Sequence, residues 1–379
     1  MDEFQVFESL NGKGINLTAV DRIKNIYLAN ARQAFSGSIA SRSWDSIKDE
    51  LILVSDEKEE NWVIHFFVSF FFNIDKYRTG KSKLAKRFKD YIKDSEDFPS
   101  VHRQLVSAAK FYGKLRKADV ANLELKNTLK ELADLGQEQI YVPLLTFAMR
   151  YKIDSDDFRL IAKALLVFIV RYTVCKNPTN ALDSIFKAMF ELKGSGPKGV
   201  PTAAEVISFI AARQEDDGEF ESKFAVYTTR ASGTARYLLS KLEIYYKLKD
   251  GDASPTLGGQ TLEHIVPQKV NLEEWYDGKL PDEAIQASFI EDYVCSIGNM
   301  AILKAEDNSR ANNKNYDAKR KVYKNGNNKP EYGTPYGTFK LISMLYDSYP
   351  NEFTHEQIEQ RAKDFAKDAP SIWPMTVVE

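Results

Sequence analysis

Cysteine is scarce in this sequence, and its scarcity narrows the class of protein. Only two cysteines occur among the 379 residues, Cys175 and Cys295, and they lie far apart in apolar surroundings. A disulfide framework or a Cys-x-x-Cys zinc site needs more cysteines at closer spacing. We therefore expect no disulfide scaffold and no structural zinc, and we expect a reducing compartment such as the cytoplasm.

Two further features are missing: an excess of charge of one sign, and a long apolar run. The formal net charge is only −2, so nucleic-acid binding would have to come from local patches rather than from overall basicity. The most apolar stretch, residues 62–72, is far shorter than the ~20 residues of a membrane-spanning helix and predicts a buried helix. The acidic start Met1-Asp2-Glu3-Phe4 predicts no secretion signal and, with the short apolar run, no association with a membrane.

The apolar residues that are present recur mainly at helical spacing between residues 44 and 250. Phe158, Ile161 and Leu165 exemplify the i, i+3, i+4, i+7 pattern of an amphipathic helix. A break at residues 251–259, rich in glycine and containing proline, separates this region from the rest. We predict a mainly α protein, with an all-helical domain over residues 44–250 and an α+β domain over residues 251–379.

Histidine is also rare, with four in the chain, and one of them stands in a distinctive setting. His264 directly follows Glu263 in the stretch Thr261-Leu262-Glu263-His264-Ile265-Val266-Pro267-Gln268. Histidine is the side chain whose ordinary pKa best suits a general base near neutral pH, so His264 is our candidate base for activating water. The other three, His65, His102 and His355, have no such neighbours and are expected to be structural.

Glu263 and an asparagine further along the chain are candidate ligands of a divalent cation. Hydrolysis of a phosphodiester needs positive charge near the scissile phosphate, and carboxylate and amide oxygens suit Mg²⁺ or Mn²⁺. Adjacent side chains of a strand point to opposite faces, so Glu263 and His264 can reach opposite sides of one phosphate. Asn299, in the apolar segment 296–303, is our candidate for orienting the His264 imidazole.

The third part of the predicted site is the asparagine cluster Asn308, Asn312 and Asn313. It precedes a helix expected near residues 316–323, which we predict to carry the second metal ligand. Asparagine also commonly serves as a helix cap or turn residue, so a structural role for any one of the three stays open. Asn308 is our first choice for the second metal ligand.

These three blocks together resemble a known family. The order Glu-His-Ile-x-Pro-Gln, Gly-Asn-Met and Asn-Ser-x-x-x-Asn-Lys-x-aromatic-x-x-Lys-Arg is similar to the C-terminal HNH nuclease domain of GmrSD-type, modification-dependent restriction proteins. The resemblance runs from about residue 257 to residue 374. It implies a ββα-metal nuclease that restricts foreign, chemically modified DNA, such as phage DNA (type IV restriction), with catalytic roles for His264, Asn299, Glu263 and Asn308.

A second, shorter resemblance lies at the start of the chain. Residues 7–25 are similar to the end of the N-terminal nucleotide-binding, modification-sensing domain of the same family, and Thr18 with Asp21 predicts a helix start near Ala19. The Asp-Gly-Gln-Gln-Arg motif of that domain is not found. We therefore expect residues 1–43 to be only the tail of such a domain and carry no nucleotide hydrolysis over. Three explanations stay open: the sequence is a fragment of a longer protein, the rest of that domain is supplied by a nucleotide-binding sensor subunit, or it has been lost.

The segment from Lys304 to Lys340 is locally basic, with nine basic against four acidic residues. A charge run is usually a solvated face, but beside a phosphate-cleaving site it favours contact with the DNA backbone. The candidate DNA-binding residues are Arg310, Lys314, Lys319, Arg320 and Lys321.

Together these patterns predict an HNH endonuclease that cuts DNA with Mg²⁺ or Mn²⁺. Two alternatives remain open from sequence. One is a non-catalytic regulatory subunit that binds DNA or a partner through an HNH-like fold, and the other is a ribonuclease, because metal-assisted phosphodiester cleavage does not itself distinguish DNA from RNA. The sequence does not indicate an oligomeric state.

Overall fold

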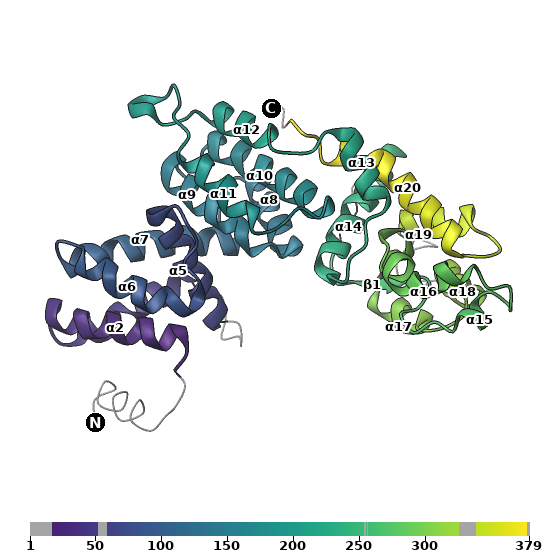
Figure 1. Ribbon diagram of the computed structural model, residues 1–379, viewed down its shortest axis with the longest axis horizontal. Helices are drawn as coiled ribbons and strands as arrows, with labels where there is room; N and C mark the ends of the chain where they lie inside the picture. The colour runs from purple at the N-terminus through teal and green to yellow at the C-terminus, as the bar shows by residue number, and fades with distance from the viewer. Residues whose placement is uncertain (1–16, 52–58, 254, 256, 326–338, 377–379) are drawn as a thin grey trace.

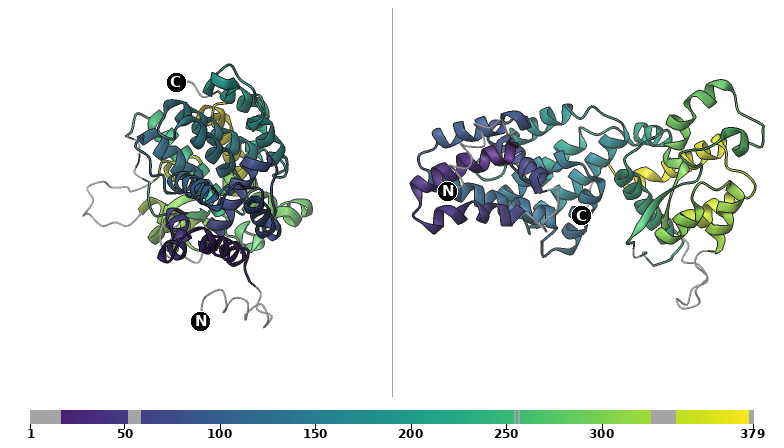
Figure 2. Two further views of the ribbon diagram at one scale, coloured as in Figure 1. Left: turned by 90° about the vertical axis from the view of Figure 1, so that its left-hand side faces the viewer. Right: turned by 90° about the horizontal axis from the view of Figure 1, so that it is seen from below.

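The computed structural model describes residues 17–51, 59–253, 255, 257–325 and 339–376. The molecule is elongated, with the N-terminal helices at one end and the C-terminal unit at the other, and both further views agree (Figures 1 and 2). Helices dominate, and the described strands form one two-stranded sheet, so the prediction of a mainly α protein is confirmed. Within the described residues, no helix is long and apolar enough to cross a membrane.

The N-terminal end is a bundle of amphipathic helices around an aromatic core. The first helix among the described residues, α2, begins after Thr18, whose side chain and that of Asp21 form the predicted capping box. The apolar run of residues 62–72 lies in α5, where Phe66, Phe67 and Phe71 are buried, as predicted. The elements are α2 Ala19–Ala34, α3 Ser38–Ser43, α4 Asp45–Leu51, α5 Glu59–Asp75, η1 Lys81–Lys83, α6 Leu84–Lys93 and α7 Phe98–Lys117.

The middle of the molecule is organised around α10 (Asp156–Val174). Its side chains are buried over most of its circumference, which is typical of a helix enclosed by others. A short turn separates it from α11, and Thr202 caps α12 with Glu205 in a capping box. The surrounding elements are α8 Leu123–Leu135, η2 Glu138–Ile140, α9 Tyr141–Tyr151, α11 Ala181–Phe190, η3 Pro197–Gly199 and α12 Ala203–Ala211.

Three helices connect this middle region to the C-terminal unit: α13 (Asp217–Ala225), α14 (Ser232–Lys249) and α20 (His355–Ile372). Helix α13 packs along α20, and α14 contacts α8 on one side and β2, α19 and α20 on the other. Helix α20 leads the chain back toward α13, as Figure 1 shows. The predicted boundary at residue 251 falls between α14 and the sheet, although α14 contacts both regions.

The C-terminal unit is a small antiparallel sheet surrounded by short helices. Strand β1 (Gln260–His264) pairs with β2 (Met300–Lys304) in a register that sets Gln260 opposite Lys304 and His264 opposite Met300. A second hydrophobic core lies beneath it. The other elements are α15 Leu272–Trp275, α16 Glu283–Phe289, the π-helical turn η4 Ile290–Val294, η5 Ile297–Asn299, α17 Ala305–Ala311, α18 Tyr316–Asn325 and α19 Lys340–Ser348.

The structure differs from the sequence prediction in the segment after β2. Residues 305–325 form two helices rather than one, and Asn308 lies in the first, α17. Asn312 is the C-cap residue of this helix, with a positive φ of 43° and a ψ of −145°, so its backbone leaves the helical conformation there. The chain therefore turns between α17 and α18, so that both helices can contact β1.

Candidate active site

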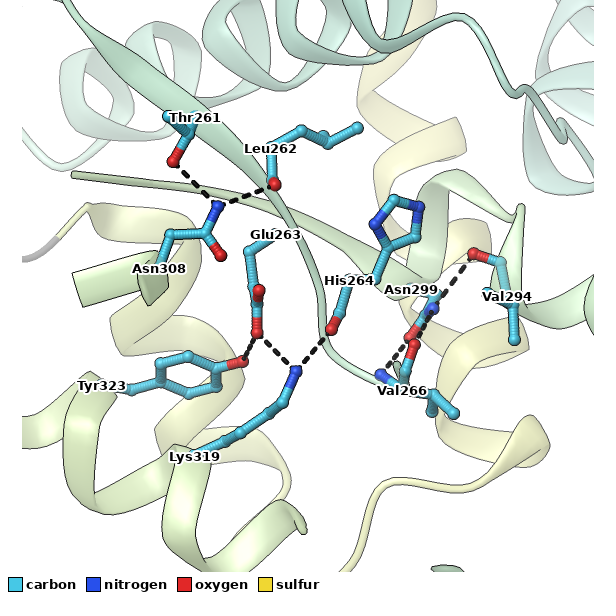
Figure 3. Close-up of polar contacts among 10 residues, drawn as sticks. All are labelled: Thr261, Leu262, Glu263, His264, Val266, Val294, Asn299, Asn308, Lys319 and Tyr323. Atoms are coloured by element: carbon cyan, nitrogen blue, oxygen red, sulfur yellow. Dashed lines mark hydrogen bonds and ion pairs between the residues drawn. The ribbon is translucent and has the colours of Figure 1, made fainter. Parts of the chain in front are cut away.

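The candidate site is built at the end of β1, where the strand gives way to Pro267 and Gln268. Neighbouring residues of a strand point to opposite faces. Figure 3 shows this arrangement, with the Glu263 carboxylate on one side of β1 and the His264 imidazole on the other. Helices α17 and α18 approach the strand from the Glu263 side, and the turn that carries Asn299 lies behind its end.

Glu263 is buried against α18. Its Oε1 atom accepts hydrogen bonds from Lys319 Nζ at 2.6 Å and from the Tyr323 hydroxyl at 2.9 Å. The same ammonium donates to the His264 carbonyl oxygen at 2.7 Å. Burial raises the pKa of Glu263, and the positive charge of Lys319 opposes this rise. The predicted metal ligand is thus also one half of a buried ion pair.

His264 is half-buried and neutral. Burial and, to a smaller extent, the charge of Lys319 lower the pKa of the imidazole to about 4. The Nε2 atom lies 3.4 Å from the amide nitrogen of Gln268, a long contact in which the amide can donate only to an unprotonated Nε2. At neutral pH His264 therefore has a nitrogen lone pair available to accept a proton.

Asn308 is fixed by the strand that it faces. Its Nδ2 atom donates to Thr261 Oγ1 and to the Leu262 carbonyl oxygen, both at 2.9 Å. An amide nitrogen has two hydrogens, so these bonds occupy both and determine which way the amide faces. Among the described residues no donor is bonded to Oδ1, which leaves this oxygen available as a ligand.

Glu263, His264 and Asn308 all line one cavity of about 380 Å³. Asn312 and Asn313 are exposed at its edge, so the structure brings together all the residues predicted as base or metal ligands, without Asn299. Within the described residues, no three His, Cys, Asp or Glu side chains gather as a metal site. The side-chain oxygen donors that line this cavity are one carboxylate, four amides and the hydroxyls of Thr261 and Ser309.

The predicted contact between Asn299 and the His264 imidazole is not made. Asn299 is completely buried, and its side chain bonds only to backbone: Oδ1 accepts from Val266 N at 2.8 Å, and Nδ2 donates to the Val266 and Val294 carbonyls at 3.0 and 3.1 Å. The Oδ1 atom that would accept from the ring is bonded to Val266 N, and both amide hydrogens are used as well, so Asn299 makes no bond to the imidazole. Instead it fixes the chain two residues beyond His264.

Two of the five predicted DNA-binding residues, Lys319 and Arg320, are buried or partly buried and not exposed on the surface. The Lys319 side chain is only 1% exposed, so its ammonium cannot reach a DNA backbone, and this prediction is wrong. Arg320 is partly buried, with its guanidinium 4.4 Å from the centre of the Tyr346 ring on α19. Lys314 and Lys321 are exposed, and Arg310 is partly exposed beside Asp307.

The C-terminal region of the chain is similar to a known protein family. Residues 214–368 match the family model described as GmrSD restriction endonucleases, C-terminal domain. We call this region the GmrSD-type domain, after the family that it resembles. No match was found among curated proteins. The matched residues include α13 and α14 as well as the sheet, so the GmrSD-type domain contains the helices that join it to the middle of the molecule.

Sequence reasoning missed two residues that support the site of the GmrSD-type domain. Tyr323 lies one turn after Lys319 on α18, and this i, i+4 spacing on a helix that follows the motif was the available signal. Arg361 of α20 is buried and donates to the Gly298 and Met300 carbonyls at 2.7 and 2.8 Å. No local pattern indicates that contact, because the partners lie about sixty residues apart in sequence.

Proposed function

We propose that the GmrSD-type domain is a metal-dependent DNA endonuclease of the HNH type, with β1, β2 and α17 as its ββα-metal unit. The observation that carries this proposal is the convergence of a neutral histidine, a carboxylate and an oriented amide oxygen on one cavity. General-base activation of water and charge neutralisation at phosphate are the two requirements of phosphodiester hydrolysis, and this set of residues provides for both.

His264 is the general base in this proposal. A lone pair on the ring accepts a proton from the water that attacks phosphorus, and the low pKa keeps the ring unprotonated before substrate arrives. The Lys319 charge is fixed on the main-chain carbonyl of the same residue, so the ring is carried by a strand end that is held from the α18 side. The half-buried setting excludes part of the surrounding water, which strengthens these electrostatic effects.

The residues at the cavity also fit a hard divalent ion. Asn308 presents an amide oxygen that no described donor uses, and Glu263 lines the same cavity. Mg²⁺ commonly takes one or two protein oxygens and keeps its remaining positions for water and substrate phosphate. When bound, such an ion would supply positive charge to the scissile phosphate and the leaving oxygen. Asn312 and Asn313 are the alternative oxygen donors at the edge of the cavity.

Asn299 and Arg361 are positioning residues in this scheme. Asn299 fixes residues 265–266, and Arg361 fixes the turn that carries Asn299 through two carbonyl bonds. Their effect on catalysis is indirect, because neither contacts the imidazole. The family relationship supports DNA as the substrate and foreign, modified DNA as the target, with a nucleotide-binding sensor domain or subunit as a proposed partner.

The test is cleavage of DNA by the His264→Ala protein in the presence of Mg²⁺. We expect the rate to fall by about 10²–10⁴-fold, the usual effect of losing a general base, while DNA affinity and thermal stability stay close to the parent. A matched control is His355→Ala, because His355 bonds the Tyr276 hydroxyl and does not line the cavity. Undiminished cleavage by well-folded His264→Ala protein would exclude the HNH assignment, and preferential cleavage of RNA would favour the ribonuclease.

A further inference from the structure

Lys319 is the residue at this site whose position the proposed chemistry does not explain. Its ammonium is buried between the side chain of Glu263 and the main chain of His264, at 2.6 and 2.7 Å. Burying an ion pair costs desolvation energy that the attraction between the charges only partly offsets, so such a pair is weak support for a purely stabilising role. An apolar residue packed at the same place would often stabilise the fold as well.

The charges lining the cavity show what Lys319 changes there. Glu263 is the only acidic side chain among the residues that line it, and the other lining residues carry no formal charge once His264 is neutral. Lys319 neutralises that single carboxylate. The lining residues and Lys319 together therefore present no net negative charge to a dication entering the cavity, and the Lys319 ammonium repels it. In partly buried surroundings this repulsion is several times stronger than in water.

We propose that Lys319 couples divalent-ion binding to DNA binding at the proposed nuclease site. Without DNA, the neutral Glu263–Lys319 pair keeps the affinity for the ion low. A DNA phosphate in the cavity supplies the missing negative charge, so the ion and the DNA each bind more tightly to the protein that already holds the other. Such coupling is necessarily reciprocal. Lys319 is thus a positioning residue for Glu263 and also makes the affinity for the ion depend on bound DNA.

Contacts other than those of Lys319 also hold Glu263 and its strand in place. Tyr323 bonds the same Oε1 atom of Glu263, so the carboxylate has a second, uncharged support on α18. Asn308 bonds the two strand residues before Glu263 and holds β1 from α17. Removing the Lys319 charge would therefore leave the carboxylate and the strand supported by other bonds, and would change chiefly the electrostatic potential in the cavity.

The experiment measures Mn²⁺ binding by electron paramagnetic resonance, using the full chain carrying His264→Ala so that DNA remains intact. Binding is compared with and without a DNA duplex. We expect Mn²⁺ to bind at least about tenfold more tightly with DNA, which is the gain expected when a phosphate charge completes the site. Tight Mn²⁺ binding without DNA, with no gain when DNA is added, overturns the inference whatever any variant shows.

The role of Lys319 is then tested with Lys319→Met, which keeps the length of the side chain and removes its charge. Mn²⁺ affinity without DNA should rise by about tenfold or more, and the gain from DNA should shrink. Lys110→Met, at an exposed position on α7 at the other end of the molecule (Figure 1), is the matched control and should leave both values unchanged. If Lys319→Met bound Mn²⁺ more weakly than the parent, and by the same factor with and without DNA, Lys319 would only support Glu263. That result would overturn the inference.

A variant that fails to fold and a parent that binds no Mn²⁺ each call for a further measurement. If Lys319→Met fails to fold, Lys319→Arg keeps the charge and should retain the DNA-dependent gain; loss of that gain in folded Lys319→Arg counts against the inference. If the parent binds no Mn²⁺ even with DNA, and the unsubstituted protein cuts DNA in excess EDTA, the proposed function itself fails. Tight binding without DNA in a protein that needs metal for cleavage contradicts only the coupling.

Discussion

The charge state of His264 is the residue-scale property on which the proposed chemistry most depends. An isolated histidine titrates at about 6.5 and would be partly protonated in mildly acidic solution. Here burial and the nearby Lys319 charge both disfavour the protonated ring and lower its pKa to about 4. The ring is therefore a base over the whole neutral range, although a weaker one than an ordinary histidine.

This shift predicts the pH dependence of cleavage. The profile of kcat/KM reports ionisations of the free enzyme, so activity should rise through about pH 4 and not through about pH 6.5. The measurement uses a fixed excess of Mn²⁺ at every pH, so that metal occupancy does not vary along the profile. A midpoint near 6.5 would show that the base titrates as an ordinary exposed histidine.

The same shift has a consequence for stability with a definite sign. Between about pH 4 and pH 6.5 the unfolded chain binds a proton at residue 264 that the folded chain does not, so the free energy of unfolding falls as the pH is lowered through this window. Above about pH 6.5 neither the folded nor the unfolded chain binds this proton, so His264 no longer lowers the free energy of unfolding. In His264→Ala this part of the acid sensitivity should be lost, which thermal melting at about pH 7 and about pH 5 can measure.

Asn308 and Asn313 differ in a way that allows the proposed ligand to be identified. Asn308 is held by two bonds to β1, whereas Asn313 is exposed at the edge of the cavity. We expect Asn308→Ala to raise the Mg²⁺ concentration for half-maximal cleavage by about tenfold, which corresponds to roughly 1.4 kcal/mol. Asn313→Ala serves as the matched control, and a metal requirement raised by Asn313→Ala alone would reverse the assignment.

At the scale of elements, the sequence predicted an all-helical region over residues 44–250 but not how its helices meet. Periodicity and capping residues are local signals, and they correctly indicated the start of α2 and the position of α10. The contacts of Lys319 and Arg361 join residues more than fifty positions apart, and a local pattern does not encode them. Lys319 was assigned to DNA because a basic residue in a charged run is usually exposed.

The Gly298-Asn299 pair shows an element-scale constraint that the structure explains. Helix α20 passes so close to residue 298 that a Cβ atom there would lie 2.1 Å from the Ile358 carbonyl oxygen and 3.0 Å from the Ala362 side chain. Only glycine fits without moving the helix. The close approach also lets Arg361 reach the carbonyls on either side of Asn299.

Gly298→Ala should therefore destabilise the protein and disturb the site together. Overpacking of this kind usually lowers the free energy of unfolding by about 1–3 kcal/mol. We expect a value at the upper end of that range, because the atom that the added methyl group meets belongs to the backbone of α20. The matched control is Gly258→Ala, where no atom lies within 4 Å of the added carbon. Thermal melting compares the two, and equal melting temperatures would show that α20 does not constrain residue 298.

At the scale of the whole molecule, the C-terminal end of the chain joins the GmrSD-type domain to the middle helices. Arg171 of α10 is fully buried and donates to the Trp373 carbonyl at 3.0 Å, to Asp217 at 2.9 Å and to the Glu215 carbonyl at 2.7 Å. The Trp373 indole donates to the Tyr237 hydroxyl of α14. The glycine-rich break at residues 251–259 indicated a boundary in sequence, but these bonds cross between the two regions.

The distribution of charge over the elongated molecule limits where DNA can bind. With a net charge of −2, the chain must bind DNA through a local face, and the exposed cations left after the corrections above include Lys314 and Lys321. For each phosphate that the protein no longer neutralises, the slope of log K against log salt should become shallower by about 0.9, whatever the DNA sequence. We expect Lys314→Ala and Lys321→Ala each to weaken binding at low salt and to flatten this slope.

The matched control for that measurement lies at the other end of the molecule. Lys110 is exposed on α7, which Figure 1 places at the opposite end from α17 and α18. Lys110→Ala removes the same charge, so a change in overall net charge alone would affect all three variants equally. An unchanged slope in Lys314→Ala and Lys321→Ala, or an equal loss in Lys110→Ala, would mean that DNA approaches the cavity across another surface. In that case Lys304, exposed at the end of β2 next to the cavity-lining Ala305, is the cation to test next.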